Sequence, residues 1–363
     1  MKNILAKWKN LDWALMGALL FLAAISLISL ASYNMSFFWR QLVWYVAAFV
    51  VIIVGSGFNW SWLLRWPVFR YGLYWASVLM LALSNFQSKA AVVRGTKSWL
   101  VIGGFQFEPE EIAKLALVIL LAGFLTRRYL AVWRAKYLFT SFFYAAVPAL
   151  LVAIHPDLGS TIVILSIWVG FVLMGGVHKK RLIIGFGSII VAFALLWTLF
   201  LKPYQKDRLT AFMFPERDPL GINYNVIQSK IAIGSAGFWG KGFGEGTQSQ
   251  LHFLPEAQTD FIFASFTEEW GILGATLLLL TFLFAVFRLI SISLRAGSND
   301  AKFVVFGCAL IFFIQFLINV GSNLGLLPVT GITLPFVSYG GSSLLTTAIL
   351  ISIIQHIKLE SSG

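Results

Sequence analysis

The sequence contains little cysteine and little charge. Its single cysteine, Cys308, cannot form a disulfide or a thiolate metal site within the chain. The four histidines are scattered along the chain and match no zinc-binding spacing. Only 12% of the 363 residues are charged, whereas soluble domains average about 25%. The composition therefore excludes an ordinary water-soluble domain.

Long apolar runs dominate instead. Hydrophobic residues make up 59% of the chain, and the mean hydropathy is +0.83. Runs near twenty residues recur, which is the length of a helix that crosses a bilayer. We expect the first run to be a retained span rather than a cleaved signal peptide. The prediction is an all-α polytopic membrane protein with about ten transmembrane helices, near 13–32, 39–57, 67–84, 109–126, 138–154, 158–176, 182–201, 261–287, 303–323 and 336–355.

The excess of basic residues predicts how these spans are oriented. There are 27 Lys and Arg against 15 Asp and Glu, a net charge of +12. In a membrane protein such an excess sets topology and attracts anionic lipids, so we expect membrane lipids, and no nucleic acid, among the partners. Most basic residues of the short loops fall on one side, which is then cytoplasmic together with both termini. The chain is predicted to be one membrane domain, 1–363, with a large external loop, 202–260, between spans seven and eight.

The external loop ends in Thr259-Asp260, where polar sequence meets an apolar helix. An aspartate at such a junction can simply cap the helix. It can also be functional, because carboxylates near a membrane are costly unless they have a partner or a task. Glu268 and Glu269 follow in the same helix. At about 100° per residue, Glu268 lies about 80° from Asp260 and Glu269 on the opposite face, so we expect Glu269 to bind a partner on another helix.

A second candidate is the segment Glu108-Pro-Glu-Glu111-Ile-Ala-Lys114. Proline at the first helical position and acids in the first turn are typical of a helix start. Lys114 needs another explanation, because an apolar run follows it. Either Glu111, three residues earlier, forms a structural ion pair with it, or the lysine belongs to a site for an anionic ligand.

Further cations lie in the loop 85–107 and in the long external loop 202–260. Arg94, Lys97 and Trp99 could anchor the chain at the interface or contact phosphate and lipid headgroups. Arg208 and Lys230 lie in the long loop with several glycines, which let backbone amides approach phosphates. Their spacing matches no known phosphate-binding fingerprint.

The segment from Asn323 to Ser343 contains two prolines, several glycines and several hydroxyl groups. Such sequence at membrane depth indicates a broken helix or re-entrant backbone. Irregular backbone is tolerated there only when it is buried in protein or lines a wet cavity. We favour a cavity wall over a purely structural turn.

Three segments together resemble the SEDS family (shape, elongation, division and sporulation). They are Phe107-Glu-Pro-Glu-Glu-Ile-Ala-Lys114, Gly246 to Phe263, and Gly325 to Ser343. Two stretches, Gln228 to Ser235 and Gly246 to Leu251, are more similar to the RodA elongation branch than to the FtsW division branch. The resemblance implies a peptidoglycan glycosyltransferase of the bacterial cytoplasmic membrane. Such an enzyme polymerises lipid II at the outer face and works with a class B penicillin-binding protein, which crosslinks the product.

The resemblance also implies roles for individual residues. The essential aspartate of the family falls on Asp260, its loop tryptophan on Trp99 and its intramembrane pair on Glu111 and Lys114. Our hypothesis is that Asp260 is the general base for the acceptor sugar hydroxyl. Cations would stabilise the departing diphosphate, and the candidates are Lys114, Arg208, Lys97 and Arg94. Lys230 and Ser343 complete the candidate substrate-binding residues.

The sequence does not establish a cofactor. No ligand spacing demands a metal, although the carboxylates could assist a Mg or Mn ion.

A flippase or transporter of lipid-linked cell-wall precursors is the alternative function, since intramembrane charges and broken helices also suit transport. A transporter would place its acids near the midplane in paired half-helices. This chain places its most prominent acid in an external loop and shows no internal repeat, which favours polymerisation. A scaffold that only recruits its partner is a third possibility.

Overall fold

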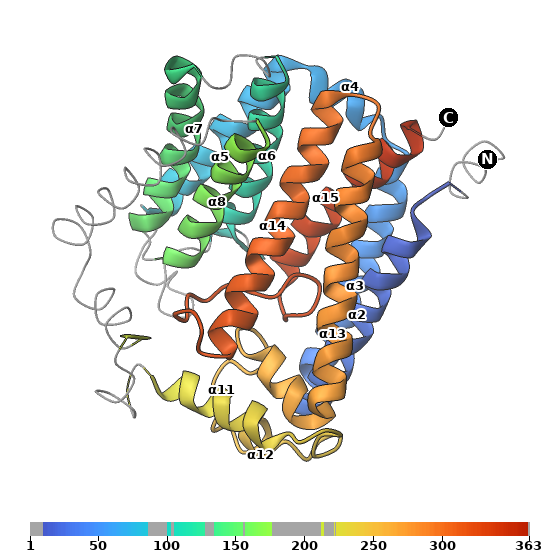
Figure 1. Cartoon of the computed structure of the whole chain (residues 1–363), viewed down its shortest axis with the longest axis vertical. Coiled ribbons are helices and arrows are strands. Elements are labelled where there is room, and N and C mark those ends of the chain that lie inside the picture. The colour runs from blue at the N-terminus through green and yellow to red at the C-terminus, as the bar shows by residue number, and fades with distance from the viewer. Residues whose placement is uncertain are drawn as a thin grey trace.

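The computed structural model describes residues 10–85, 100–102, 105–127, 134–154, 157–175, 212–213, 221 and 223–361. These residues form a bundle of helices with two short strands (Figure 1). The first half contains α2 (Trp13–Tyr33), α3 (Met35–Ser56), α4 (Trp60–Arg65), α5 (Pro67–Asn85), β1 (Leu100–Ile102), β2 (Phe105–Phe107), α6 (Pro109–Thr126), α7 (Ala135–Ile154) and α8 (Leu158–Met174). The second half contains α11 (Tyr224–Ser235), α12 (Thr247–Gln250), α13 (Ile262–Arg295), α14 (Asn299–Asn323) and α15 (Gly341–Glu360).

The predicted membrane fold is confirmed, with adjustments. Six of the described helices are long and apolar enough to cross a membrane. The last predicted span, 336–355, begins too early, because α15 starts only at Gly341. The eighth is longer than predicted and continues to Arg295. The predicted span 182–201 lies outside the described residues. The strands β1 and β2 were not predicted; they pair antiparallel, with Leu100 opposite Phe107.

Residues with short polar side chains cap the N-termini of several helices. Asp12 accepts a hydrogen bond from the backbone N–H of Leu15 at 2.9 Å and caps α2. Asn34 caps α3 in the same way and also separates it from α2. Asp157 caps α8 through the N–H of Ser160. These residues supply the acceptors that the first turn of a helix lacks.

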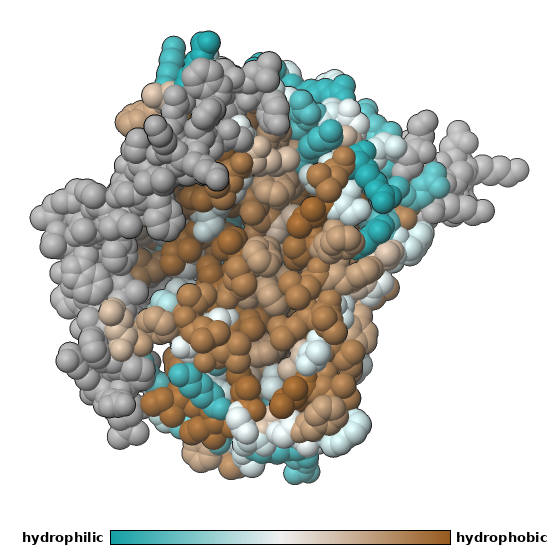
Figure 2. Space-filling view, viewed as in Figure 1, coloured by the Kyte–Doolittle hydropathy of each residue, from teal (hydrophilic) through white to brown (hydrophobic). Residues whose placement is uncertain are grey.

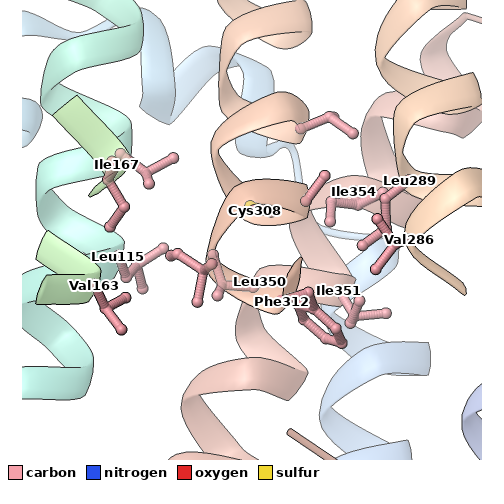
Figure 3. Packing of buried hydrophobic residues seen from close by; sticks show 14 of the residues in the cluster. Leu115, Val163, Ile167, Val286, Leu289, Cys308, Phe312, Leu350, Ile351 and Ile354 are labelled. Carbon is pink, nitrogen blue, oxygen red and sulfur yellow. The ribbon is translucent and has the colours of Figure 1, made fainter. Parts of the chain in front are cut away.

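Helix α14 lies at the centre of the bundle and packs against α6, α8 and α13. Figure 3 shows Cys308 and Phe312 on α14 between Leu115 of α6 on one side and Val286 of α13 on the other. The outer surface is different: on the face that Figure 2 shows, apolar residues cover the middle and polar residues gather toward the ends. An apolar belt between polar ends is the surface expected of a protein that faces lipid.

The two ends of the bundle hold different parts of the chain. At one end, Arg288 of α13 forms an ion pair with Asp12, and Asp12 also bonds to Gln355 of α15. This joins the start of the described chain to its end. Helices α11 and α12, which belong to the predicted external loop, lie at the opposite end (Figure 1). The described part of that loop is therefore partly helical rather than structureless.

Close helix contacts at Gly307 provide a test of the packing. A Cβ at Gly307 of α14 would lie 2.6 Å from Val118 Cγ1 and 2.9 Å from Phe171 Cζ. We expect Gly307→Val to destabilise the bundle by about 1–3 kcal/mol, the usual result of overpacking. The thermal unfolding midpoint of the purified protein in detergent measures this. Gly17→Val is the matched control, because nothing lies within 4 Å of that position; an equal loss in both variants would contradict the packing.

Candidate functional site

Asp260 stands immediately before α13 and is half-buried. The cap position of that helix is held by Phe261, whose carbonyl accepts the first helical hydrogen bond, from Ser265 N. Asp260 therefore lies one residue before the N-cap of α13. It does not occupy the N-cap position itself.

Two buried asparagines of α14 hold the main chain of Asp260. The side-chain amides of Asn319 and Asn323 both donate to the Asp260 carbonyl, at 3.0 and 2.8 Å. The Asn323 side-chain oxygen accepts a hydrogen bond from Ala264 N at 3.1 Å, so a neighbouring helix caps the first turn of α13. Helix α14 thus holds the main chain of Asp260, in addition to the hydrogen bonds that Thr259 N and Phe261 N donate to Glu256 O within the loop.

The segment between α14 and α15 crosses beside Asp260. Ser338 donates its hydroxyl to the Thr259 carbonyl at 2.6 Å, and Tyr339 N donates to the Gln258 carbonyl at 2.9 Å. A Cβ at Gly331 would lie 3.9 Å from Asp260 Oδ2. The hydrogen bonds of this segment to the loop residues just before Asp260 therefore explain its polar, glycine-rich composition.

The same segment lines a cavity, as its composition predicts. The cavity has a volume of about 230 Å³ and contains one lysine, Lys230 of α11. Lys230 is exposed, and its Cε lies 2.1 Å from where a Cβ of Gly325 would be. Gly325 has φ +69°, a backbone conformation that favours glycine. The lining consists of Phe212, Gly221, Asn223, Asn225, Val226, Ile227, Lys230, Gly325, Pro328 and Val329.

Two further acids of α13 have structural partners. Glu268 is fully buried and binds Lys241 Nζ at 2.7 Å and the backbone N–H of Gln248 at 3.1 Å. Glu269 accepts hydrogen bonds from Ser32 of α2 and from Gln250. The prediction of a partner for Glu269 on another helix is confirmed. Glu268 fastens the loop to the helix, and its role is therefore distinct from that of Asp260.

Helix α13 breaks at Gly271, where φ is +69° and ψ is −173°. The break exposes backbone groups on both sides of this residue. The loop 237–242 satisfies them: Lys241 N and Gly242 N donate to the carbonyls of Glu268 and Glu269, each at 3.0 Å. Ile272 N and Leu273 N donate in turn to carbonyls of the loop. This pairing fixes the loop 237–242 against the membrane helix α13.

Glu111 and Lys114 form an ion pair, one of the two alternatives that the sequence left open, with Nζ 2.7 Å from Oε1. Lys114 is only 1% exposed, so the pair is part of the helix packing. The start of α6 also touches the start of α15, where Glu108 N donates to Ser342 Oγ at 3.2 Å. The adjacent Ser343 is half-buried in the first turn of α15. The segment before α15 therefore connects the Glu111–Lys114 pair to the Asp260 region.

Sequence reasoning missed Glu110. Its place in the first turn of α6 was explained by the helix start alone, but Glu110 is 4% exposed and lies beside Asp157, the cap of α8, and Ser160 of α8. One of its carboxyl oxygens has no hydrogen-bond partner among the described residues. The polar break before α8 was the available signal, since a buried acid needs polar neighbours.

The remaining candidates lie outside the described residues: Arg94, Lys97, Trp99 and Arg208. Within the described part of the chain, no three His, Cys, Asp or Glu side chains come together as a metal site.

The fold and the site define a polytopic membrane protein with an aspartate at a helix start and a cavity that contains a lysine, both bordered by the segment between α14 and α15. The chain belongs to the FtsW/RodA/SpoVE family of cell cycle proteins, whose family model matches residues 5–363. This agrees with the SEDS resemblance of the sequence.

Named relatives have similar sequences over most of the chain. The peptidoglycan glycosyltransferase MrdB of Escherichia coli K12 is 38% identical over 292 residues, which cover 79% of this chain and 77% of MrdB. The probable peptidoglycan glycosyltransferase FtsW of Saccharophagus degradans is 34% identical and covers 97% of this chain and 94% of its own. Stage V sporulation protein E of Bacillus subtilis is 35% identical, with coverage of 79% and 80%.

Solved structures share the fold. A chain of a peptidoglycan synthase complex that coordinates polymerization and crosslinking superposes with a TM-score of 0.82 at 30% identity, covering 97% of this chain and 98% of its own. The rod shape determining protein RodA of Thermus thermophilus gives a TM-score of 0.72 at 25% identity, with coverage of 97% and 98%.

The asparagine contacts predict the effect of a substitution. Asn323→Ala leaves the Asp260 carbonyl with one donor fewer and removes the acceptor of Ala264 N. We expect a loss of about 1–3 kcal/mol of stability, as for other buried groups left unpaired, measured by thermal unfolding. Asn299→Ala at the exposed start of α14 is the control and should be neutral. A neutral Asn323→Ala would show that the asparagine does not hold the junction.

Proposed function

We propose that this chain is a peptidoglycan glycosyltransferase that polymerises lipid II at the outer face of the bacterial cytoplasmic membrane. Relatives named for this activity support the proposal over most of the chain length. The observation that carries it is the place of Asp260, half-buried at a helix start and held by two asparagines of another helix. The elongation branch is favoured by the similarity to MrdB and to RodA.

The orientation follows from the charge pattern. The end of the bundle that contains Asp12, Arg288 and Gln355 faces the cytoplasm, because the basic short loops fall on that side. Asp260, the cavity and helices α11 and α12 then face outward. A class B penicillin-binding protein is the partner that crosslinks the glycan strands, in keeping with the likeness to a chain of a peptidoglycan synthase complex.

The transfer step is a substitution at the anomeric carbon of the donor sugar. Asp260 accepts the proton of the acceptor hydroxyl, and the acceptor oxygen forms the new bond to that carbon. The bond from the carbon to the diphosphate oxygen breaks, and its electron pair leaves with the lipid diphosphate. A cation close to the leaving oxygen lowers the barrier because it stabilises charge that develops there.

Lys230 suits the cationic role better than Lys114 does. Lys230 is exposed and lines the cavity, whereas the ammonium of Lys114 is buried against Glu111 at 2.7 Å. We therefore assign Lys230 to the donor diphosphate and the Glu111–Lys114 pair to positioning. Roles in the rest of the substrate site remain predictions for five residues: Arg94, Lys97, Trp99, Arg208 and Ser343.

Asp260→Asn tests the base directly, since it keeps the shape of the side chain and removes its basicity. We expect lipid II polymerisation by the purified chain with its penicillin-binding partner to fall about 10²-fold or more. Labelled glycan products separated on a gel give the rate. The control is Glu245→Gln, an exposed acid of the same loop, which should keep full activity.

Full activity of Asp260→Asn would remove this residue from the mechanism. Movement of labelled lipid II across the membrane without glycan products would favour the flippase instead.

The two lysines should respond differently to substitution. Lys230→Gln is expected to lower kcat/KM about tenfold or more while the unfolding midpoint stays unchanged, because the side chain is exposed. Lys114→Met leaves the Glu111 carboxylate buried without its cation and should destabilise the protein by about 3–5 kcal/mol. Thermal unfolding and product formation measured on the same samples separate these effects. A stable, inactive Lys114→Met would reverse the assignment.

A further inference from the structure

A small cavity lies between α5 and α6 at the end of the bundle opposite Asp260. Its volume is about 60 Å³, and its lining residues are Arg70, Tyr71, Leu120, Gly123, Phe124 and Arg127. Asp300, at the start of α14, pairs with Arg70, whereas Asn323, at the end of the same helix, holds Asp260. The two sites are therefore separated by roughly 35 Å of helical rise, and the proposed catalysis does not use this cavity.

The guanidinium of Arg70 is buried but poorly matched by its neighbours. Arg70 is 5% exposed. Its Nη1 lies 3.7 Å from Asp300 Oδ1, and its Nη2 lies 3.5 Å from the Arg65 carbonyl. Charge-assisted hydrogen bonds of arginine are usually about 2.7–2.9 Å long, so both contacts are loose. Asp300 Oδ1 makes no hydrogen bond within the described part of the chain.

Gly123 makes room for this arginine. A Cβ at Gly123 would lie 1.5 Å from Arg70 Nη1 and 2.4 Å from Arg70 Cζ. The guanidinium therefore rests against bare backbone of α6, at the wall of the cavity. Any larger residue at this position would displace the charged group.

The charges around the cavity do not balance. Arg70 and Arg127 both line it, and Asp300 is the acid that the structure pairs with Arg70. Among the described residues one positive charge is left over, and the buried Arg70 and the exposed Arg127 repel each other. An anion between the two guanidinium groups would remove this repulsion.

We infer that this cavity binds the phosphate of an anionic phospholipid headgroup in the cytoplasmic leaflet, given the topology proposed above. Arginine forks match phosphate oxygens in geometry, and the hydroxyl of Tyr71 is a further donor. Leu120 and Phe124 offer apolar contact to the part of the lipid next to the phosphate. Trp62 and Trp66, 61% and 48% exposed on α4 and just after it, mark this end as a membrane interface. Basic pockets between helices at that depth are typical sites for anionic lipids.

Native mass spectrometry of the full-length protein tests the inference. Phosphatidylglycerol is titrated into the purified wild type, and phosphatidylcholine serves as the neutral lipid. We expect one phosphatidylglycerol to be retained in preference to phosphatidylcholine. Arg127→Gln should weaken that binding roughly fivefold, since one surface arginine contributes about this much to anionic lipid binding. Arg127 is exposed, so the fold should tolerate the change.

Two further variants complete the design. Gly123→Ala should also weaken binding, because its Cβ takes the place of the Arg70 guanidinium. Arg295→Gln removes the same charge from an exposed site at the end of α13 and should leave binding unchanged. Equal weakening in Arg127→Gln and Arg295→Gln would overturn the site in favour of diffuse attraction. So would equal retention of the two lipids, or displacement of the lipid by inorganic phosphate at matched concentration.

Discussion

Backbone groups that leave a helix at membrane depth must find partners inside the protein, because lipid offers none. This constraint shapes the region around Asp260. Helix α13 breaks at Gly271, and the loop 237–242 pairs with the freed groups on both sides of the break. At the start of the same helix, Asn319 and Asn323 bind the Asp260 carbonyl. These hydrogen bonds hold the main chain that carries the carboxylate.

The charged residues of this region fall into two groups, according to whether they form ion pairs inside the fold. Glu268 is bound by Lys241, and Glu111 by Lys114, each at 2.7 Å. The first pair fastens the loop to α13, and the second lies within α6 as part of its packing. Asp260 and Lys230 differ from them, since the first is half-buried at the loop–helix junction and the second is exposed in the cavity wall. A polymerase needs such a division, because charges that hold the fold cannot also be exchanged with a substrate.

Much of this could be predicted from the sequence, because apolar run length and helix-start chemistry are local properties. The spans follow from the length of the apolar runs. Spacing along one helix gives the possible Glu111–Lys114 pair and the outside partner for Glu269. The role of Glu268 did not, because its partner Lys241 comes from a loop whose path depends on the break at Gly271. Glu110 was misjudged for a similar reason: its burial against α8 depends on how two helices pack, which no local pattern contains. The asparagines of α14 read as part of an apolar helix until their contacts with Asp260 are seen.

The central claim is that Asp260 stands where an acceptor sugar and a donor diphosphate meet. The most direct measurement is a structure of the inactive Asp260→Asn protein with lipid II bound. We expect the acceptor hydroxyl within about 2.6–3.2 Å of residue 260, the reach of a general base, and the donor diphosphate against Lys230. A diphosphate bound elsewhere, with residue 260 out of reach of any sugar hydroxyl, would contradict it.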